Sequence, residues 1–136
     1  VNNIVQKIAV GGVIVNDGRV LIIQRVSGDT FPDLWELPSG KKEFLENSLE
    51  AIVRETKEET GLDTKVIDTI GVFNFIVEKE DEIRDIVQVN FLLELIGSSK
   101  VKLSSEHQNF AWITSKGVDK YNISNEVKEI INKVFT

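Results

Sequence analysis

Apolar residues along this chain recur either every two residues, as in a β-strand, or every three to four residues, as in a helix. The positions where the period changes predict the boundaries of its strands and helices. The segments 5–15 and 20–26 are rich in apolar and β-branched residues. Between them stands Asn16-Asp17-Gly18, a strong signal for a tight turn between antiparallel strands. The sequence therefore predicts an N-terminal β-hairpin, and the glycine and proline residues after it favour a loop over 27–38.

The segment 47–61 carries the pattern of one helix. Asn47 is a candidate N-cap and Gly61 a candidate C-terminal cap. On a wheel of roughly 100° per residue, one arc carries the side chains that are expected to be buried, namely Leu49, Ile52, Val53, Thr56 and Thr60. The other arc carries charged side chains, namely Arg54, Glu55, Glu58 and Glu59.

Two further strands are expected at 65–77 and 85–95. Within the second, apolar and polar side chains alternate with the period of two that a half-buried strand shows. The apolar positions are Val87, Val89, Phe91, Leu93 and Leu95, and the polar positions are Gln88, Asn90 and Glu94. We therefore expect the apolar positions to pack inward and the polar positions to meet solvent.

The last third of the chain predicts a polar loop over 97–109, a short strand over 110–114 and a final helix. Asn122 or Ser124 would cap this helix. Its apolar positions recur at i, i+3, i+4 and i+7, and they are Val127, Ile130, Ile131 and Val134. Strands with one helix in the middle and one at the end indicate an α/β fold, a mixed β-sheet sandwiched between α-helices.

The composition mainly excludes certain classes of protein and of partner. The 136 residues are 41% hydrophobic and 28% charged, without repeat or linker, which is typical of one globular domain over 1–136. The absence of cysteine excludes disulfides and thiolate chemistry and fits the cytoplasm, and no apolar stretch is long enough to span a bilayer. A net charge of −6 argues against long nucleic acids as partners. We expect a cytoplasmic protein that binds a small molecule.

The charged arc of the middle helix is the first sign of chemistry. Glu55, Glu58 and Glu59 stand at helical spacing, where like charges destabilise an isolated helix by about 0.2–0.5 kcal/mol per pair. Three carboxylates on one face are what a hard divalent cation requires, because it prefers oxygen ligands. An acidic helix face is more often simply exposed to solvent. The surrounding sequence is therefore needed to distinguish a metal site from a solvated face.

The spacing of eight residues favours the metal site. They follow the pattern G-x5-E-x7-R-E-x-x-E-E-x-G-L and are Gly40, Glu46, Arg54, Glu55, Glu58, Glu59, Gly61 and Leu62. This pattern resembles the Nudix box, the signature of the Nudix hydrolases, and the likeness to the MutT-like branch covers most of the chain. Thr56 stands where the family usually has an aliphatic residue, and Ser39 and Leu45 stand where it often has glycine.

The resemblance implies the Nudix fold, an α/β/α sandwich, and a set of metal ligands. Glu58 and Glu59 would bind the metal, and Glu55 would be a further ligand or the catalytic base. The backbone at Gly40 would offer a carbonyl oxygen. The cofactor would be Mg²⁺, with Mn²⁺ as the alternative, and it would bridge the diphosphate and lower the pKa of the attacking water.

The same resemblance gives roles to residues around these ligands. Arg54 and Glu46 would hold the carboxylates in place, and Arg54 is counted among the catalytic residues. Glu106, six residues before Trp112, matches an additional metal ligand or base of MutT-like enzymes, with ordinary loop solvation as the alternative. The only histidine, His107, is expected to be an incidental loop residue.

Four further residues match substrate contacts of MutT-like enzymes, namely Arg25, Leu37, Arg84 and Asn125. Arg25 and Arg84 would reach the substrate, and surface charge is their alternative. Leu37 would line the base pocket or belong to the core. Asn125 would read a guanine-type base or cap the last helix.

The function implied is metal-dependent hydrolysis of a nucleoside diphosphate-linked substrate, in particular a nucleoside triphosphate cleaved to the monophosphate and pyrophosphate. A nucleotide-sugar or dinucleotide pyrophosphatase is the alternative enzyme. A Nudix-fold module that senses a nucleotide without cleaving it is expected to lack the box glutamates, which this chain has. The sequence specifies neither the base, the leaving group nor the oligomeric state.

Overall fold

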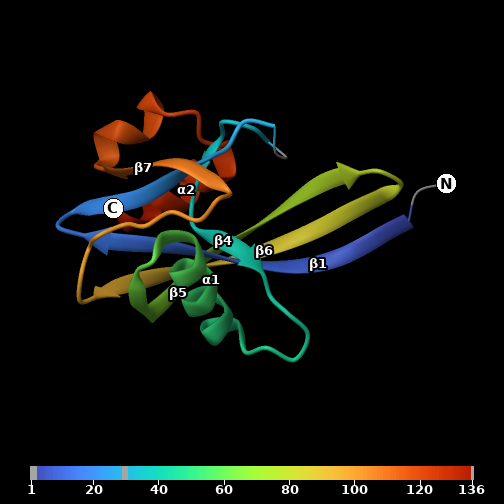
Figure 1. Cartoon of the computed structure of the whole chain (residues 1–136), viewed down its shortest axis with the longest axis horizontal. Helices are drawn as coiled ribbons and strands as arrows, with labels where there is room; N and C mark the ends of the chain where they lie inside the picture. Colours follow the sequence, from blue (N-terminus) through green and yellow to red (C-terminus); the bar gives the residue numbers. More distant parts are fainter. Residues whose placement is uncertain (1–2, 29–30, 136) are drawn as a thin grey trace.

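The computed structural model describes residues 3–28 and 31–135 and is organised around one seven-stranded β-sheet (Figure 1). The strands are β1 (Asn3–Asn16), β2 (Arg19–Arg25), β3 (Trp35–Glu36), β4 (Ser39–Lys41), β5 (Asp63–Lys79), β6 (Glu82–Ile96) and β7 (His107–Ile113). The helices are α1 (Ser48–Thr60), the short 3₁₀ helix η1 (Ser115–Lys120) and α2 (Asn125–Val134). Along the sheet the order is β3-β2-β1-β6-β5, with β4 added to β1 and β7 to β2.

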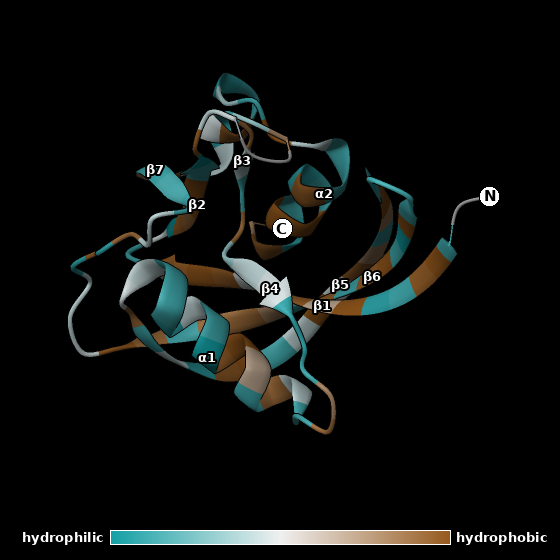
Figure 2. Ribbon diagram, turned by 45° about the vertical axis from the view of Figure 1, so that its right-hand side comes forward, coloured by the Kyte–Doolittle hydropathy of each residue, from teal (hydrophilic) through white to brown (hydrophobic). Residues whose placement is uncertain are grey.

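The two faces of the sheet bury different side chains, because successive residues of a strand point to opposite sides. Ile14 of β1 packs in one core with Ile52 of α1, whereas its neighbour Val13 packs in a second core with Ile131 of α2. The two helices therefore cover opposite faces, as Figure 2 shows. The expected α/β sandwich is confirmed.

Helix α1 begins and ends where the sequence predicts. The Asn47 side chain accepts hydrogen bonds from the backbone N–H groups of Leu49 (2.8 Å) and Glu50 (3.3 Å). Gly61 adopts the left-handed conformation with φ 74°, which costs glycine little. Two positions of the predicted wheel are wrong: the Leu49 residue is 46% exposed, and Glu59 is only 8% exposed. Glu59 is buried because its carboxylate points toward β4.

The prediction that the polar residues of β6 meet solvent is also wrong at the centre of the strand. Gln88 and Asn90 are buried, while Val87 is 37% exposed. Both amides lie over Gly11 of β1, where a Cβ atom would overlap Asn90 Oδ1 and Gln88 Nε2, so the glycine leaves room for them against the sheet. The buried amides satisfy each other, since Gln88 Nε2 donates to Asn90 Oδ1 (2.8 Å) and Asn90 Nδ2 donates to the carbonyl of Gly71 (3.3 Å).

Smaller differences occur at element boundaries. The short strand β3 lies within the predicted loop, β7 begins at His107 instead of 110, and η1 was not predicted. Strand β7 begins earlier than predicted because it pairs with β2. Such pairing holds polar residues in a strand although their own pattern does not predict one. At the last helix, Ser124 is the cap and accepts from the N–H of Val127 (3.3 Å), as one of the two alternatives predicted.

The ends of three strands project beyond the helices and form what we call the arm (Figure 1). The arm consists of residues 3–8 of β1, 76–79 of β5 and 82–87 of β6. Its strands remain fully paired, β1 with β6 in parallel and β5 with β6 antiparallel. Within residues 3–28 and 31–135, no helix is long and apolar enough to cross a membrane.

Candidate active site

Strand β4 lies against α1 and fixes the position of the predicted Nudix box. Gly40 packs so closely on Glu55 that a Cβ atom at position 40 would overlap the carboxylate of Glu55. The absence of a side chain at Gly40 thus lets the backbone of β4 contact the acidic face of the helix. This explains in physical terms why the first position of the pattern is glycine.

Arg54 connects the acidic residues of the site. Its Nε donates to Glu46 Oε2 (2.7 Å) and its Nη2 to Glu46 Oε1 (3.0 Å). Its Nη1 donates to Glu55 Oε1 (3.0 Å) and to Glu58 Oε1 (3.2 Å). The hydrogen bonds from Arg54 hold the pKa of Glu46 at about 2, so Glu46 stays ionised. The structure therefore brings Glu46 and Arg54 to the carboxylates, as the resemblance implies.

Glu59 is the most buried carboxylate of the group. Its Oε1 accepts the backbone N–H of Ser39 (2.8 Å). Burial raises the pKa of Glu59 to about 9, and the negative charges of Glu36, Glu55 and Glu106 act in the same direction. Burial also raises the pKa of Glu55, although Arg54 opposes this. The site therefore holds several carboxylates close together at a large desolvation cost.

These carboxylates line an open cavity of about 390 Å³, which we call the catalytic cavity. Its charged and polar wall consists of Arg25, Ser39, Gly40, Lys41, Glu55, Glu58, Glu59, Gln88, Ser104 and Glu106. Glu106 comes from the segment before β7 and is held by a hydrogen bond from the N–H of Val26 to its carbonyl (3.1 Å). Segments far apart in the sequence thus bring Glu106 to the same cavity as the box glutamates, and its charge acts on Glu55 and Glu59.

The donor set suits Mg²⁺, which takes oxygen ligands. Glu55, Glu58 and Glu59 line the cavity together with Gly40, and a divalent cation bound among these like-charged carboxylates would offset the cost of their burial. In the part of the chain that the structure describes, no three acidic, histidine or cysteine groups converge on one point. Glu58, with a side chain 57% exposed, has room to change its rotamer toward the other two.

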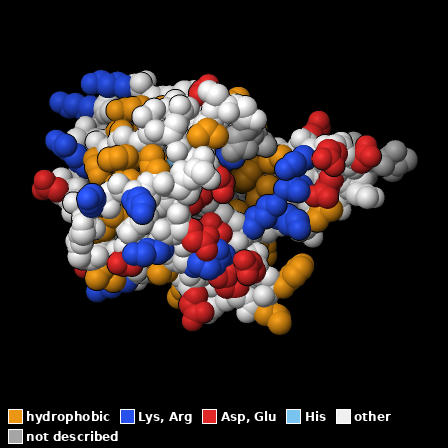
Figure 3. Space-filling view, viewed as in Figure 1, with side chains coloured by type: hydrophobic (Ala, Val, Ile, Leu, Met, Phe, Trp, Pro, Cys, Tyr) orange, Lys and Arg blue, Asp and Glu red, His pale blue; other side chains and the backbone are white. Residues whose placement is uncertain are grey.

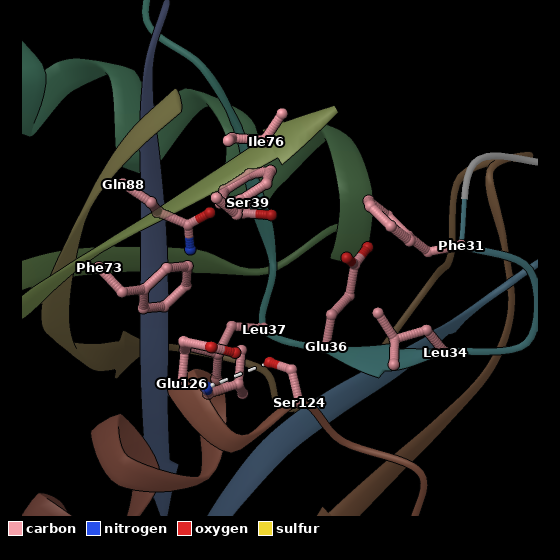
Figure 4. A pocket seen from close by; sticks show the side chains of 12 residues that line it. Phe31, Leu34, Glu36, Leu37, Ser39, Phe73, Ile76, Gln88, Ser124 and Glu126 are labelled. Carbon is pink, nitrogen blue, oxygen red and sulfur yellow. Dashed lines mark hydrogen bonds between the residues drawn. The ribbon is translucent and has the colours of Figure 1, made fainter. Parts of the chain in front are cut away.

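A second cavity, of about 400 Å³, lies between the sheet and α2 (Figure 4). We call it the apolar cavity. Its apolar wall consists of Phe31, Leu34, Leu37, Phe73, Phe75, Ile76 and Val127, and its polar wall of Glu36, Ser39, Gln88, Ser124 and Glu126. Ser39, Phe75 and Gln88 line both cavities, so the two are neighbours along one path.

The four predicted substrate residues do not all reach these cavities. Arg25 lines the catalytic cavity, and Leu37 both lines the apolar cavity and is a core residue, 1% exposed. Asn125 is exposed at the start of α2 and is absent from the walls of both cavities, whereas its neighbours Ser124 and Glu126 line the apolar cavity. Arg84 lies on the arm, outside both cavities, with its Nε 2.7 Å from Glu82 Oε1.

Glu36, which the sequence does not single out, connects Arg25 with His107. Glu36 Oε2 accepts from Arg25 Nη1 (3.1 Å) and is hydrogen-bonded to His107 Nε2 (2.8 Å). His107 begins β7 and its side chain is fully buried, so the expectation of an incidental loop residue is wrong. The pair is separated by 71 positions in the sequence, and no local pattern relates them.

Comparison with known proteins identifies the family of the chain. A family model described as the NUDIX domain matches residues 5–134. An ADP-ribose pyrophosphatase of Methanocaldococcus jannaschii is 38% identical over 90 residues, which are 66% of this chain and 52% of that protein. A MutT-like protein of Streptomyces ambofaciens is 33% identical over 114 residues, 83% of this chain and 67% of its own length.

A solved structure extends the likeness to the whole fold. The crystal structure of a MutT protein from Methanosarcina mazei matches with a TM-score of 0.80 and 26% identity, covering 94% of this chain and 91% of that one. The chain therefore belongs to the NUDIX family. Within it the chain is similar to the MutT-like branch, as its box implies. The segment aligned with the ADP-ribose pyrophosphatase of Methanocaldococcus jannaschii spans about half the length of that protein.

Proposed function

We propose that the chain cleaves a nucleoside triphosphate to the monophosphate and pyrophosphate, with Mg²⁺ bound by Glu58 and Glu59 and with Glu55 as the general base. The observation that carries this proposal is the contact between the two cavities. An apolar, aromatic cavity suits a nucleoside, and the carboxylate-lined cavity beside it suits a metal-bound phosphate chain. Ser39, Phe75 and Gln88 lie where the two parts of such a substrate would join.

The apolar cavity offers both stacking and hydrogen bonds to a base. Phe73 and Phe75 both line it, with ring centroids 6.1 Å apart. Stacking of a base on an aromatic ring contributes about 1–3 kcal/mol and tolerates any base. Glu36 and Glu126 offer acceptors, so a base with amino or N–H groups on its edge is favoured. Glu126 and Ser124 take the place that the sequence suggests for Asn125.

The chain supplies a general base without a protein nucleophile. When bound, Mg²⁺ would neutralise phosphate charge and lower the pKa of water. Glu55 Oε2 would accept the proton of the attacking water, because Oε1 is held by Arg54. Arg54 thereby fixes the orientation of the base, and Glu106 lines the same cavity.

ADP-ribose is the second candidate substrate. The relative from Methanocaldococcus jannaschii is an ADP-ribose pyrophosphatase, and it shares 38% of the aligned residues. Cleavage of ADP-ribose would use the same carboxylates and the same nucleoside cavity. Only the group beyond the cleaved bond would differ, a ribose phosphate in place of pyrophosphate.

The test is a substrate screen in Mg²⁺ with the four common nucleoside triphosphates, ADP-ribose, a dinucleoside tetraphosphate and a nucleotide sugar. Products are separated by ion-exchange chromatography, so that pyrophosphate is distinguished from two phosphates. Glu58→Gln, purified in parallel, controls for contaminating hydrolases. Preferred conversion of a triphosphate to monophosphate and pyrophosphate supports the proposal. Preference for ADP-ribose or the nucleotide sugar overturns it in favour of the alternative.

A further inference from the structure

Four cations of the chain lie on one face of the sheet, next to the catalytic cavity. Lys41 lines that cavity and pairs with Ala9 across β4 and β1. On β1, Lys7 lies two residues before Ala9. On the neighbouring strands, Arg84 of β6 pairs with Val5 and with Val77, and Lys79 of β5 lies two residues after Val77.

The register places all four side chains on the same face. Residues two apart on a strand point to the same side, and directly paired residues do so too. Ala9, Phe75 and Ile86 belong to this face, because they pack together in one cluster with Val77 and also line the catalytic cavity. We call Lys7, Lys41, Lys79 and Arg84 the cationic row.

The cationic row brings like charges close together. The positive charges of Arg84, Lys7 and Lys79 all act on Lys41. Glu82 offsets part of this charge through its ion pair with Arg84 at 2.7 Å. Figure 3 shows Lys and Arg side chains gathered where the arm leaves the body, between the acidic side chains of the site and those of the tip. A bound polyanion would relieve the repulsion within the row.

The side chains that β5 and β6 present on this face change from aromatic to charged along the strands. From the body outward the paired residues are Phe73 with Gln88, Phe75 with Ile86, Val77 with Arg84, and Lys79 with Glu82. At about 3.3 Å per residue, Phe75 and Lys79 are separated by roughly 13 Å along β5. The face therefore leads from the aromatic wall, past the catalytic cavity, to the cations.

We infer that the cationic row binds the terminal phosphate of a nucleoside triphosphate, the outer of the two phosphates beyond the bond that is cleaved. This inference rests on the proposed orientation, with the nucleoside in the apolar cavity. It makes the row a specificity determinant, because a triphosphate has a further phosphate there and ADP-ribose has a neutral ribose. Arg84, which lies outside both cavities, then contacts the leaving group instead of the base.

The test uses Lys7→Gln/Lys79→Gln, which leaves Lys41 and the carboxylates intact. Lys116→Gln/Lys120→Gln on η1 removes the same charge from exposed positions outside both cavities and is the matched control. Binding of inorganic tripolyphosphate in Mg²⁺ is measured by calorimetry at low salt, because screening weakens exposed charge interactions. In parallel, kcat/KM is measured for a triphosphate and for ADP-ribose.

We expect the arm variant to bind tripolyphosphate about tenfold more weakly than wild type, equal to about 1.4 kcal/mol. The ratio of kcat/KM for triphosphate to that for ADP-ribose should fall similarly, mainly through KM, and the control should match wild type. Equal tripolyphosphate binding by the arm variant and wild type overturns the inference. If the arm variant binds tripolyphosphate more weakly but the wild-type protein cleaves no triphosphate, phosphate binding by the cationic row is supported. Only the proposed function is then overturned.

Discussion

Arg54 binds Glu46 through two parallel hydrogen bonds, from Nε to Oε2 at 2.7 Å and from Nη2 to Oε1 at 3.0 Å. This two-point geometry fixes the plane of the guanidinium group. The remaining Nη1 then donates to Glu55 and Glu58. Glu46 thus acts on the catalytic carboxylates through Arg54, from a loop that precedes the helix.

Glu46→Gln should therefore slow turnover without weakening substrate binding. The amide offers one acceptor where the carboxylate offers two, so Arg54 loses its fixed plane and Glu55 its fixed orientation. We expect kcat to fall about 10- to 100-fold with KM nearly unchanged. Steady-state kinetics at saturating Mg²⁺ measure this, with Glu50→Gln in the first turn of the same helix as the control. A change confined to KM would mean that Glu46 does not act through Arg54.

Glu58→Gln should abolish most activity while the fold persists. Glu58 is exposed, so its substitution creates no cavity and leaves the core intact. The loss of a charged ligand should lower kcat by orders of magnitude and raise the Mg²⁺ concentration needed for half-maximal activity. Kinetics over a Mg²⁺ series, with circular dichroism for the fold, provide the measurement. Unchanged activity would remove Glu58 from the metal site.

Glu59→Gln should stabilise the metal-free protein at neutral pH. Burial raises the pKa of Glu59 from 4.5 to about 9, so the folded state binds this proton more tightly than the unfolded state. Its contribution to the free energy of unfolding is complete below pH 4.5 and is lost as the pH rises toward 9. The loss is at most about 1.4 kcal/mol per pH unit. Glutamine has no proton to lose and avoids it.

Thermal unfolding with a chelator between pH 5 and 9 tests this expectation. The Tm of wild type should fall relative to that of Glu59→Gln as the pH rises. Added Mg²⁺ should then raise the Tm of wild type more than that of the variant, because binding to the folded state stabilises it. Parallel Tm curves for the two proteins would show that Glu59 is ionised in the folded state without metal.

Gly40→Ala should reduce activity by displacing Glu55. The new Cβ would overlap the carboxylate of Glu55, so either the side chain or strand β4 has to move. Gly117→Ala is the matched control, since its Cβ would lie 3.2 Å from Ile113 and away from both cavities. We expect kcat to fall clearly for the first variant and little for the second. Equal kinetics would show that Glu55 has freedom to move without loss of function.

The local features of the fold could be predicted because their causes are local. Asn47 and Gly61 act on the backbone of the helix that they flank, and the box glutamates share a face because a helix repeats every 3.6 residues. Ser124 caps the last helix for the same reason. Spacing along the sequence therefore determined the helices, the acidic face and the family.

Only the tertiary structure decided what surrounds that face. Gln88 is buried where it lies over Gly11 of the distant strand β1, and the hydrogen bond between Glu36 and His107 joins positions 71 apart. The same holds for the substrate side, where α2 turns Glu126 instead of Asn125 into the apolar cavity. Periodicity records which residues share a face of one element. It carries no record of which elements meet, because that depends on packing between distant segments.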